Sequence, residues 1–97
     1  MKKSELKTGM WVEMRNGELY MVVKDVDTRM YGNQDIFFAG KSGFMTGDGY
    51  DELMMNDRTL RNSENYDIVK VHKKSPDRYL LSPEHKGELL WEFVKLS

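Results

Sequence analysis

Asn16-Gly17 stands between two runs of apolar residues, and no other part of the chain narrows the possible folds as much. Asn-Gly in this setting is the strongest short-range signal for a β-hairpin. A two-residue type I′ turn needs positive φ at both central positions, and Asn followed by Gly adopts that conformation at the least cost. The sequence therefore predicts antiparallel strands over residues 10–15 and 18–23, joined by a two-residue turn.

The two-residue turn also predicts which residues face each other across the hairpin. It places Val12 opposite Met21 and Trp11 opposite Val22. Because side chains alternate between the two faces of a strand, one face of the hairpin is then wholly apolar and the other is mixed. A slip of one residue would move every side chain of one strand to the other face. An isolated hairpin is marginal in water, so we expect further strands to cover the apolar face.

A second hairpin is predicted from two short runs of residues that favour β-structure, 36–39 and 44–46. The glycine-containing loop between these runs places Phe38 opposite Met45. The preceding segment, 24–34, has charged residues and glycine but no steady period, and it is interpreted as a connection.

The C-terminal half adds predicted strands at 66–72 and 88–96. In the first of them, alternation puts Val69 and Val71 on the same face. The stretch before it mixes helical spacing with turn residues, so we expect a short irregular helical excursion over 50–62. Short strands separated by turns rich in glycine and asparagine are typical of a mainly β protein. We therefore expect a single domain spanning all 97 residues, built as a small antiparallel barrel or roll.

The composition of the chain excludes several kinds of site and partner. The chain has no cysteine, which rules out disulfides and cysteine zinc sites. No apolar run approaches the ~18–20 residues of a membrane-spanning helix, and the N-terminal residues lack the apolar segment of a secretory signal. We therefore expect a cytoplasmic protein. The formal net charge of -1 argues against a partner held mainly by electrostatic attraction.

Several phrases of the sequence resemble a known group of proteins. They are Leu6-Lys7-Thr8-Gly9-Met10, Arg15-Asn16-Gly17, Asp67-Ile68-Val69-Lys70-Val71 and Leu90-Trp91-Glu92. In this order they look like small uncharacterised proteins that phages and prophages of Gram-positive bacteria encode, and those proteins resemble SH3-like barrels. The resemblance implies a phage origin, an SH3-like β-barrel domain and the host cell cytoplasm as location. It transfers no catalytic residue. Many small phage proteins bind and block a host component, including defence systems.

The preferred function is non-enzymatic binding of a bacterial host protein or protein complex. Such a protein would act as an inhibitor, anti-CRISPR-like or otherwise anti-defence, by occupying a protein surface. The chain has 8 methionines, and methionine is adaptable and frequent at binding surfaces. Self-association of the chain through an exposed edge strand would use the same surfaces. The candidate partner-binding residues are Trp11, Tyr20, Tyr50, Leu53, Met54 and Met55.

Two alternative functions stay open. The first is nucleic-acid binding, because basic side chains beside aromatic rings are how small barrels grip single strands. The second is a sponge for a small nucleotide signal, which needs a pocket where rings meet basic groups. Candidate residues for nucleic acid are Tyr66, His72, Lys73, Lys74, Arg78 and Lys86, and candidate walls of a nucleotide pocket are Phe37, Phe44, Tyr50 and Arg58.

Motifs for catalysis and metal binding are weak. His72 and His85 lack the spacing of adjacent metal ligands, and the acidic run at 47–52 departs from the order of a calcium loop. The loop 40–43 echoes a phosphate loop but lacks its upstream glycine. We therefore expect no enzymatic activity, no metal and no cofactor.

Overall fold

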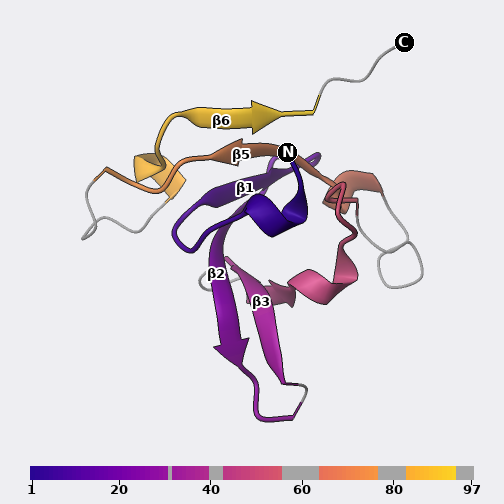
Figure 1. Ribbon diagram of the computed structural model, residues 1–97. Coiled ribbons are helices and arrows are strands. Elements are labelled where there is room, and N and C mark those ends of the chain that lie inside the picture. Colours follow the sequence, from indigo (N-terminus) through magenta and orange to yellow (C-terminus); the bar gives the residue numbers. More distant parts are fainter. Residues whose placement is uncertain (31, 40–42, 56–63, 77–82, 94–97) are drawn as a thin grey trace.

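Six antiparallel strands form one open sheet in the computed structural model, which describes residues 1–30, 32–39, 43–55, 64–76 and 83–93 (Figure 1). The order across the sheet is β4-β3-β2-β1-β5-β6, so β4 and β6 are its edges. This confirms the prediction of a mainly β protein. The strands are β1 (Trp11–Met14), β2 (Leu19–Asp27), β3 (Asn33–Phe38), β4 (Phe44–Thr46), β5 (Ile68–His72) and β6 (Leu89–Glu92).

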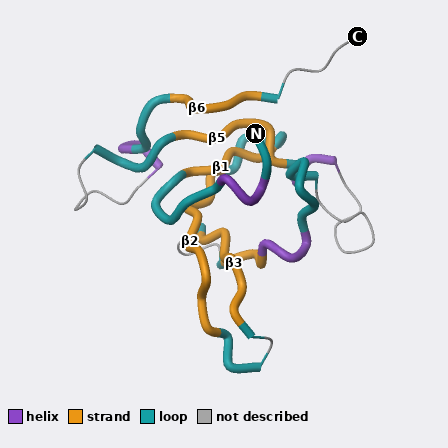
Figure 2. The backbone as a smooth tube through the Cα atoms, in the orientation of Figure 1, coloured by secondary structure: helices purple, strands orange, loops and turns teal. Residues whose placement is uncertain are grey.

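Every helical element among the described residues is a single 3-10 turn: η1 (Lys3–Glu5), η3 (Gly47–Gly49), η4 (Glu64–Tyr66) and η5 (Pro83–His85). Figure 2 shows that the described chain between β4 and β5 consists of loops and these short turns. Residues 50–55 of the helical excursion expected over 50–62 contain no helical turn, and residues 56–62 lie outside the described part. Within that part, no helix is long and apolar enough to cross a membrane.

The first hairpin forms as expected, but its predicted register is wrong by one residue. Val12 faces Tyr20, and Trp11 faces Met21. The N–H of Gly17 donates to the carbonyl of Met14 at 2.9 Å, and the N–H of Met14 donates to the carbonyl of Glu18 at 2.8 Å. The loop therefore has three residues and ends in a left-handed glycine, at φ 90°.

Asn16 explains why the shorter turn does not form. Its side-chain oxygen accepts a hydrogen bond from the N–H of Glu18 at 3.0 Å, which is the local bond that asparagine makes in turns. The backbone of Asn16 then needs no positive φ, and only Gly17 adopts one. The extra loop residue turns β2 over, so that Tyr20 and Val22 join Val12 in the core while Met21 points away from it.

The second hairpin shows the same slip. Phe37 faces Met45, and Phe38 faces Phe44 rather than Met45. The N–H of Ala39 donates to the carbonyl of Gly43 at 2.9 Å, which continues the same register to the end of the described strands. Phe37 is fully buried, whereas Phe38 and Phe44 point to the opposite side of the sheet.

β5 departs from the simple alternation predicted for it. Val12 pairs with Val71 and Met14 pairs with Ile68, with a register shift between Glu13 and Met14. One extra residue on β5 therefore puts both Ile68 and Val71 in the core, three positions apart. The predicted partnership of Val69 with Val71 on one face is wrong for this reason.

The segment after η3 closes one side of the core. The Tyr50 ring packs edge-on against Phe37 at 5.2 Å between centroids, and its hydroxyl donates to the carbonyl of Tyr66 at 2.7 Å. Met54 is fully buried, and its carbonyl accepts the N–H of Ile68 at 3.1 Å. The core cluster comprises Leu6, Val12, Met14, Tyr20, Val22, Phe37, Tyr50, Met54, Ile68 and Val71.

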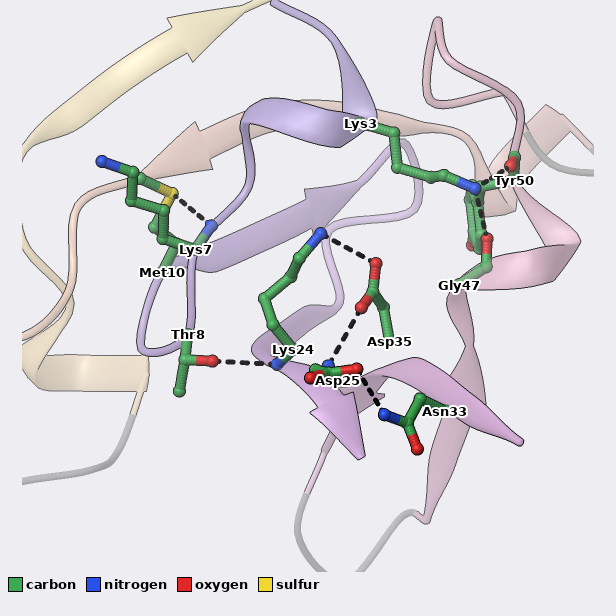
Figure 3. Close-up of polar contacts among 10 residues, drawn as sticks. All are labelled: Lys3, Lys7, Thr8, Met10, Lys24, Asp25, Asn33, Asp35, Gly47 and Tyr50. Atoms are coloured by element: carbon green, nitrogen blue, oxygen red, sulfur yellow. Dashed lines mark hydrogen bonds and ion pairs between the residues drawn. The ribbon is translucent and has the colours of Figure 1, made fainter. Parts of the chain in front are cut away.

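The segment interpreted as a connection instead extends β2 and β3, which project together beyond the other strands (Figure 1). Polar contacts support this projection (Figure 3). Lys24 Nζ donates to Asp35 Oδ2 at 2.8 Å, and the N–H of Asp25 donates to Asp35 Oδ1 at 3.1 Å. Burial alone would raise the pKa of Asp35, but the bonds from Lys24 and Asp25 outweigh it and leave that pKa lowered.

Candidate functional site

One row of side chains crosses all six strands on the face of the sheet that points away from the core. Strand register puts each member directly opposite the next, from β6 at one edge to β4 at the other. Because directly paired residues share a face, these side chains form a continuous line on the outer face. In order across the sheet, this outer row comprises Leu89, His72, Trp11, Met21, Phe38 and Phe44.

Exposure changes along the outer row. The middle of the row is covered. Trp11 is only 4% exposed, although it is not part of the core cluster. On the neighbouring strand β2, η5 makes contact with the sheet. Towards β4 the row opens to solvent, where Phe38 is 43% and Phe44 is 64% exposed. Two cross-strand phenylalanines in water, side by side, are an unusual feature for a small protein.

Half-buried apolar side chains surround this pair. Met21 faces Phe38 from β2, and in the next row Val23 faces Ile36. The aromatic patch is defined here as Phe38 and Phe44 with these three neighbours, Met21, Val23 and Ile36. All five side chains are apolar, so the patch suits an apolar partner surface rather than an ion.

A charged group lies on the same face beside the covered middle of the row. Glu13 Oε2 is 3.7 Å from Lys70 Nζ, and Glu13 Oε1 is 3.6 Å from His72 Nε2. That nitrogen is buried and has no hydrogen-bond partner among the residues that the structure describes. Burial lowers the pKa of His72, and the nearby Lys86 lowers it further, while Glu13 opposes the shift. The imidazole is therefore uncharged near neutral pH and is enclosed beside Trp11.

The expected partner-binding residues are mostly not on the surface, which corrects the patch inferred from sequence. Trp11, Tyr20, Tyr50 and Met54 are each less than a tenth exposed, and the last three belong to the core cluster. Burial also raises the pKa of the Tyr20 hydroxyl, which donates to Glu18 Oε2 at 2.6 Å. Leu53 is 64% exposed and Met55 is half-buried, so only these two offer surface to a partner.

The residues considered for nucleic acid, as far as the structure describes them, are not all on one surface. His72 is buried, and Lys73 Nζ is paired with Glu88 Oε1 at 2.7 Å. Tyr66 precedes β5 whereas His72 ends it, which separates them by on the order of 15–20 Å. Lys74 is exposed, Lys86 is half-buried, and Arg78 lies outside the described residues.

The residues considered for a nucleotide pocket are also apart. Phe37 and Tyr50 pack on each other inside the core, whereas Phe44 points out from the opposite face. Arg58 and the loop 40–42 fall outside the described part of the chain. In that part, no three histidine, cysteine or acidic residues lie close enough together to hold a metal ion.

Two adjacent phenylalanines in the sequence are the signal that predicts an exposed ring in the aromatic patch. Phe37 and Phe38 are adjacent in a strand, so their side chains must point to opposite faces. A sheet with one core face therefore places one of the two rings on the outer face, whichever register the hairpin adopts.

Comparison of the chain with protein-family models, with curated proteins and with solved structures gave no match.

Proposed function

We propose that this protein acts by binding another protein through the aromatic patch, without catalysing a reaction. The observation that carries the proposal is the exposure of Phe44 and Phe38, at 64% and 43%, beside the half-buried apolar side chains of Met21, Val23 and Ile36. Aromatic side chains are enriched in the centres of protein interfaces, where they account for much of the binding energy.

Covering Phe38 and Phe44 with a partner surface would contribute a substantial free energy to binding. Fully burying an aromatic side chain removes roughly 150–250 Å² from water, so the two half-exposed rings together offer on the order of 200 Å². At ~25 cal/mol per Å², covering that area contributes about 5 kcal/mol before the costs of association. The gain does not depend on charge, so binding should change little with salt, unlike binding to nucleic acid.

The partner we propose is a bacterial host protein, in keeping with the phage-encoded class that the sequence resembles. Binding would inhibit the partner by covering a surface that it needs. An apolar patch of this kind fits an apolar area on the partner, such as the site of another subunit.

Affinity capture from bacterial lysate with the purified, tagged protein tests this proposal. The lysate is treated with nuclease, captured proteins are identified by mass spectrometry, and affinity is then measured with the purified partner. We expect Phe44→Asp to weaken this affinity more than about tenfold, because it replaces the most exposed ring of the patch with a charge. Met30→Asp is the matched control, since Met30 is 80% exposed on the projecting hairpin.

Two outcomes would reject the proposal. Unchanged affinity of the Phe44→Asp variant would show that the patch is not the binding site. Loss of binding in a Leu53→Asp variant alone would move the site to the turn after Tyr50. Circular dichroism of each variant checks that the fold is intact.

A further inference from the structure

The loop of the first hairpin contains a residue pair that can react with itself. Asn16 is the only asparagine of the chain that is followed by glycine. In an Asn-Gly pair, the glycine nitrogen can attack the side-chain amide carbon of the asparagine, because glycine has no Cβ to crowd the approach. Both residues are exposed, and a Cβ on Gly17 would meet no atom within 4 Å in the described part of the chain. Water and base can therefore reach the Gly17 nitrogen.

The fold holds the Asn16 side chain in a position that favours this attack. Its Oδ1 accepts the N–H of Glu18 at 3.0 Å, which keeps the side chain turned towards the backbone of Gly17. Attack on the amide carbon places a negative charge on Oδ1. The Glu18 N–H already donates to that atom, so it stabilises the developing charge as the donors of an oxyanion hole do.

One hydrogen bond of the loop opposes the reaction. The Gly17 N–H donates to the carbonyl of Met14 at 2.9 Å, and it must leave that carbonyl before a base can take its proton. The loop is exposed, and opening an exposed loop costs much less free energy than unfolding the core strands. The reaction therefore requires the loop to open while the sheet stays folded.

We propose that Asn16 is a site of spontaneous covalent modification in the folded protein. Hydroxide takes the proton of the Gly17 nitrogen, and the nitrogen bonds to Cγ of Asn16. The bond from Cγ to Nδ2 then breaks, and ammonia leaves with a proton from water. Water opens the resulting five-membered imide ring at either of its two carbonyls. One opening gives aspartate at position 16, and the other gives isoaspartate, in which the main chain runs through the former side chain.

Both products change the loop that sets the register of β2. Each adds a negative charge where Asn16 is neutral, and isoaspartate also lengthens the main chain by one carbon. In isoaspartate, Oδ1 belongs to the main chain, so the local bond that the Glu18 N–H makes to it is lost. We therefore expect the isoaspartate form to melt at a lower temperature than the unmodified protein.

Prolonged incubation of the purified protein at mildly alkaline pH tests the proposal. Peptide mapping by mass spectrometry measures the conversion of amide to acid at position 16, and chromatography separates the aspartate and isoaspartate products. We expect both products, and faster conversion at higher pH. Gly17→Ala should slow the conversion at least about tenfold, because its Cβ crowds the attacking nitrogen. Asn16→Gln is the matched control, since it keeps the amide but would need a larger ring, so it should not convert.

Urea at concentrations below the unfolding transition shows whether the folded protein reacts. Local opening exposes little surface, so the rate should change little with urea, whereas a reaction that needs global unfolding speeds up steeply. Absence of conversion at Asn16 in the folded protein would overturn the proposal. A rate that rises with the unfolded fraction, or a Gly17→Ala variant as fast as the wild type, would overturn it as well. None of these outcomes bears on the aromatic patch, whose test is the capture experiment.

Discussion

The imidazole of His72 makes the stability of this protein depend on pH. Burial lowers its pKa from the ordinary value of 6.5, so the unfolded chain takes up a proton more readily than the folded one. This contribution to stability is complete above pH 6.5 and is lost as the pH falls below that value. We expect the melting temperature to fall over this range in the wild type and to fall less in His72→Gln.

His85 provides the matched control for that measurement. It is exposed on η5, so His85→Gln should keep the pH dependence of the wild type. The melting temperature of each protein is measured by calorimetry at several pH values between about 7.5 and 5.5, above the range where most carboxylates titrate. Equal slopes for His72→Gln and the wild type would show that Glu13 compensates fully for burial.

Single residues also show where a sequence pattern stops being informative. Met54 and Leu53 are adjacent apolar residues in a segment rich in polar side chains, and no periodicity distinguishes them. The structure buries Met54 completely and leaves Leu53 64% exposed. Met54 reaches the core because its backbone adopts φ 63°, a left-handed conformation that is costly for methionine. A distant contact, with the N–H of Ile68, holds that conformation, and local sequence does not encode it.

At the scale of elements, the positions of the strands along the chain could be predicted more reliably than the register in which neighbouring strands pair. Both hairpins are predicted from β-favouring residues and turn glycines, yet the register of each differs by one residue from the predicted register. Register depends on one or two hydrogen bonds in the loop, such as that from Glu18 to Asn16. These bonds decide between turns that differ little in energy, and each choice turns a whole strand over.

The first loop offers a direct test of this reasoning. Gly17 has φ 90°, and a Cβ at this position would meet no atom within 4 Å, so substitution changes only backbone strain. We expect Gly17→Ala to lower the free energy of unfolding by about 1–2 kcal/mol, and Gly17→Asn by less, because asparagine tolerates left-handed backbone. Urea denaturation measures both values. Equal stability of Gly17→Ala and the wild type would contradict the three-residue loop.

The whole molecule depends on chain segments that sequence patterns do not mark. An open sheet leaves part of its core face uncovered, and here the N-terminal residues and the segment after β4 cover it (Figures 1 and 3). Neither segment has the periodicity of a strand or an amphipathic helix, so its position could not be predicted. Leu6, from the first of these segments, belongs to the core cluster.

Lys3 joins these two covering segments. Its Nζ donates to the carbonyl of Gly47 at 3.0 Å and to that of Tyr50 at 2.7 Å. Tyr50 in turn donates to the carbonyl of Tyr66 just before β5, so one chain of contacts links the N-terminus, η3 and the sheet. Hydrogen bonds from a charged donor contribute more than neutral ones, and methionine has a similar length but donates none.

We therefore expect Lys3→Met to lower the free energy of unfolding by about 1–3 kcal/mol. The same variant should speed hydrogen exchange of the Ile68 N–H, whose acceptor is the carbonyl of Met54 in the segment that Lys3 anchors. Lys2→Met is the control, because Lys2 is exposed and the change removes the same charge. If Lys2→Met and Lys3→Met have equal stability and equal exchange, the N-terminus does not anchor this segment. In that case the packing of Tyr50 and Met54 alone must hold the uncovered side of the sheet closed.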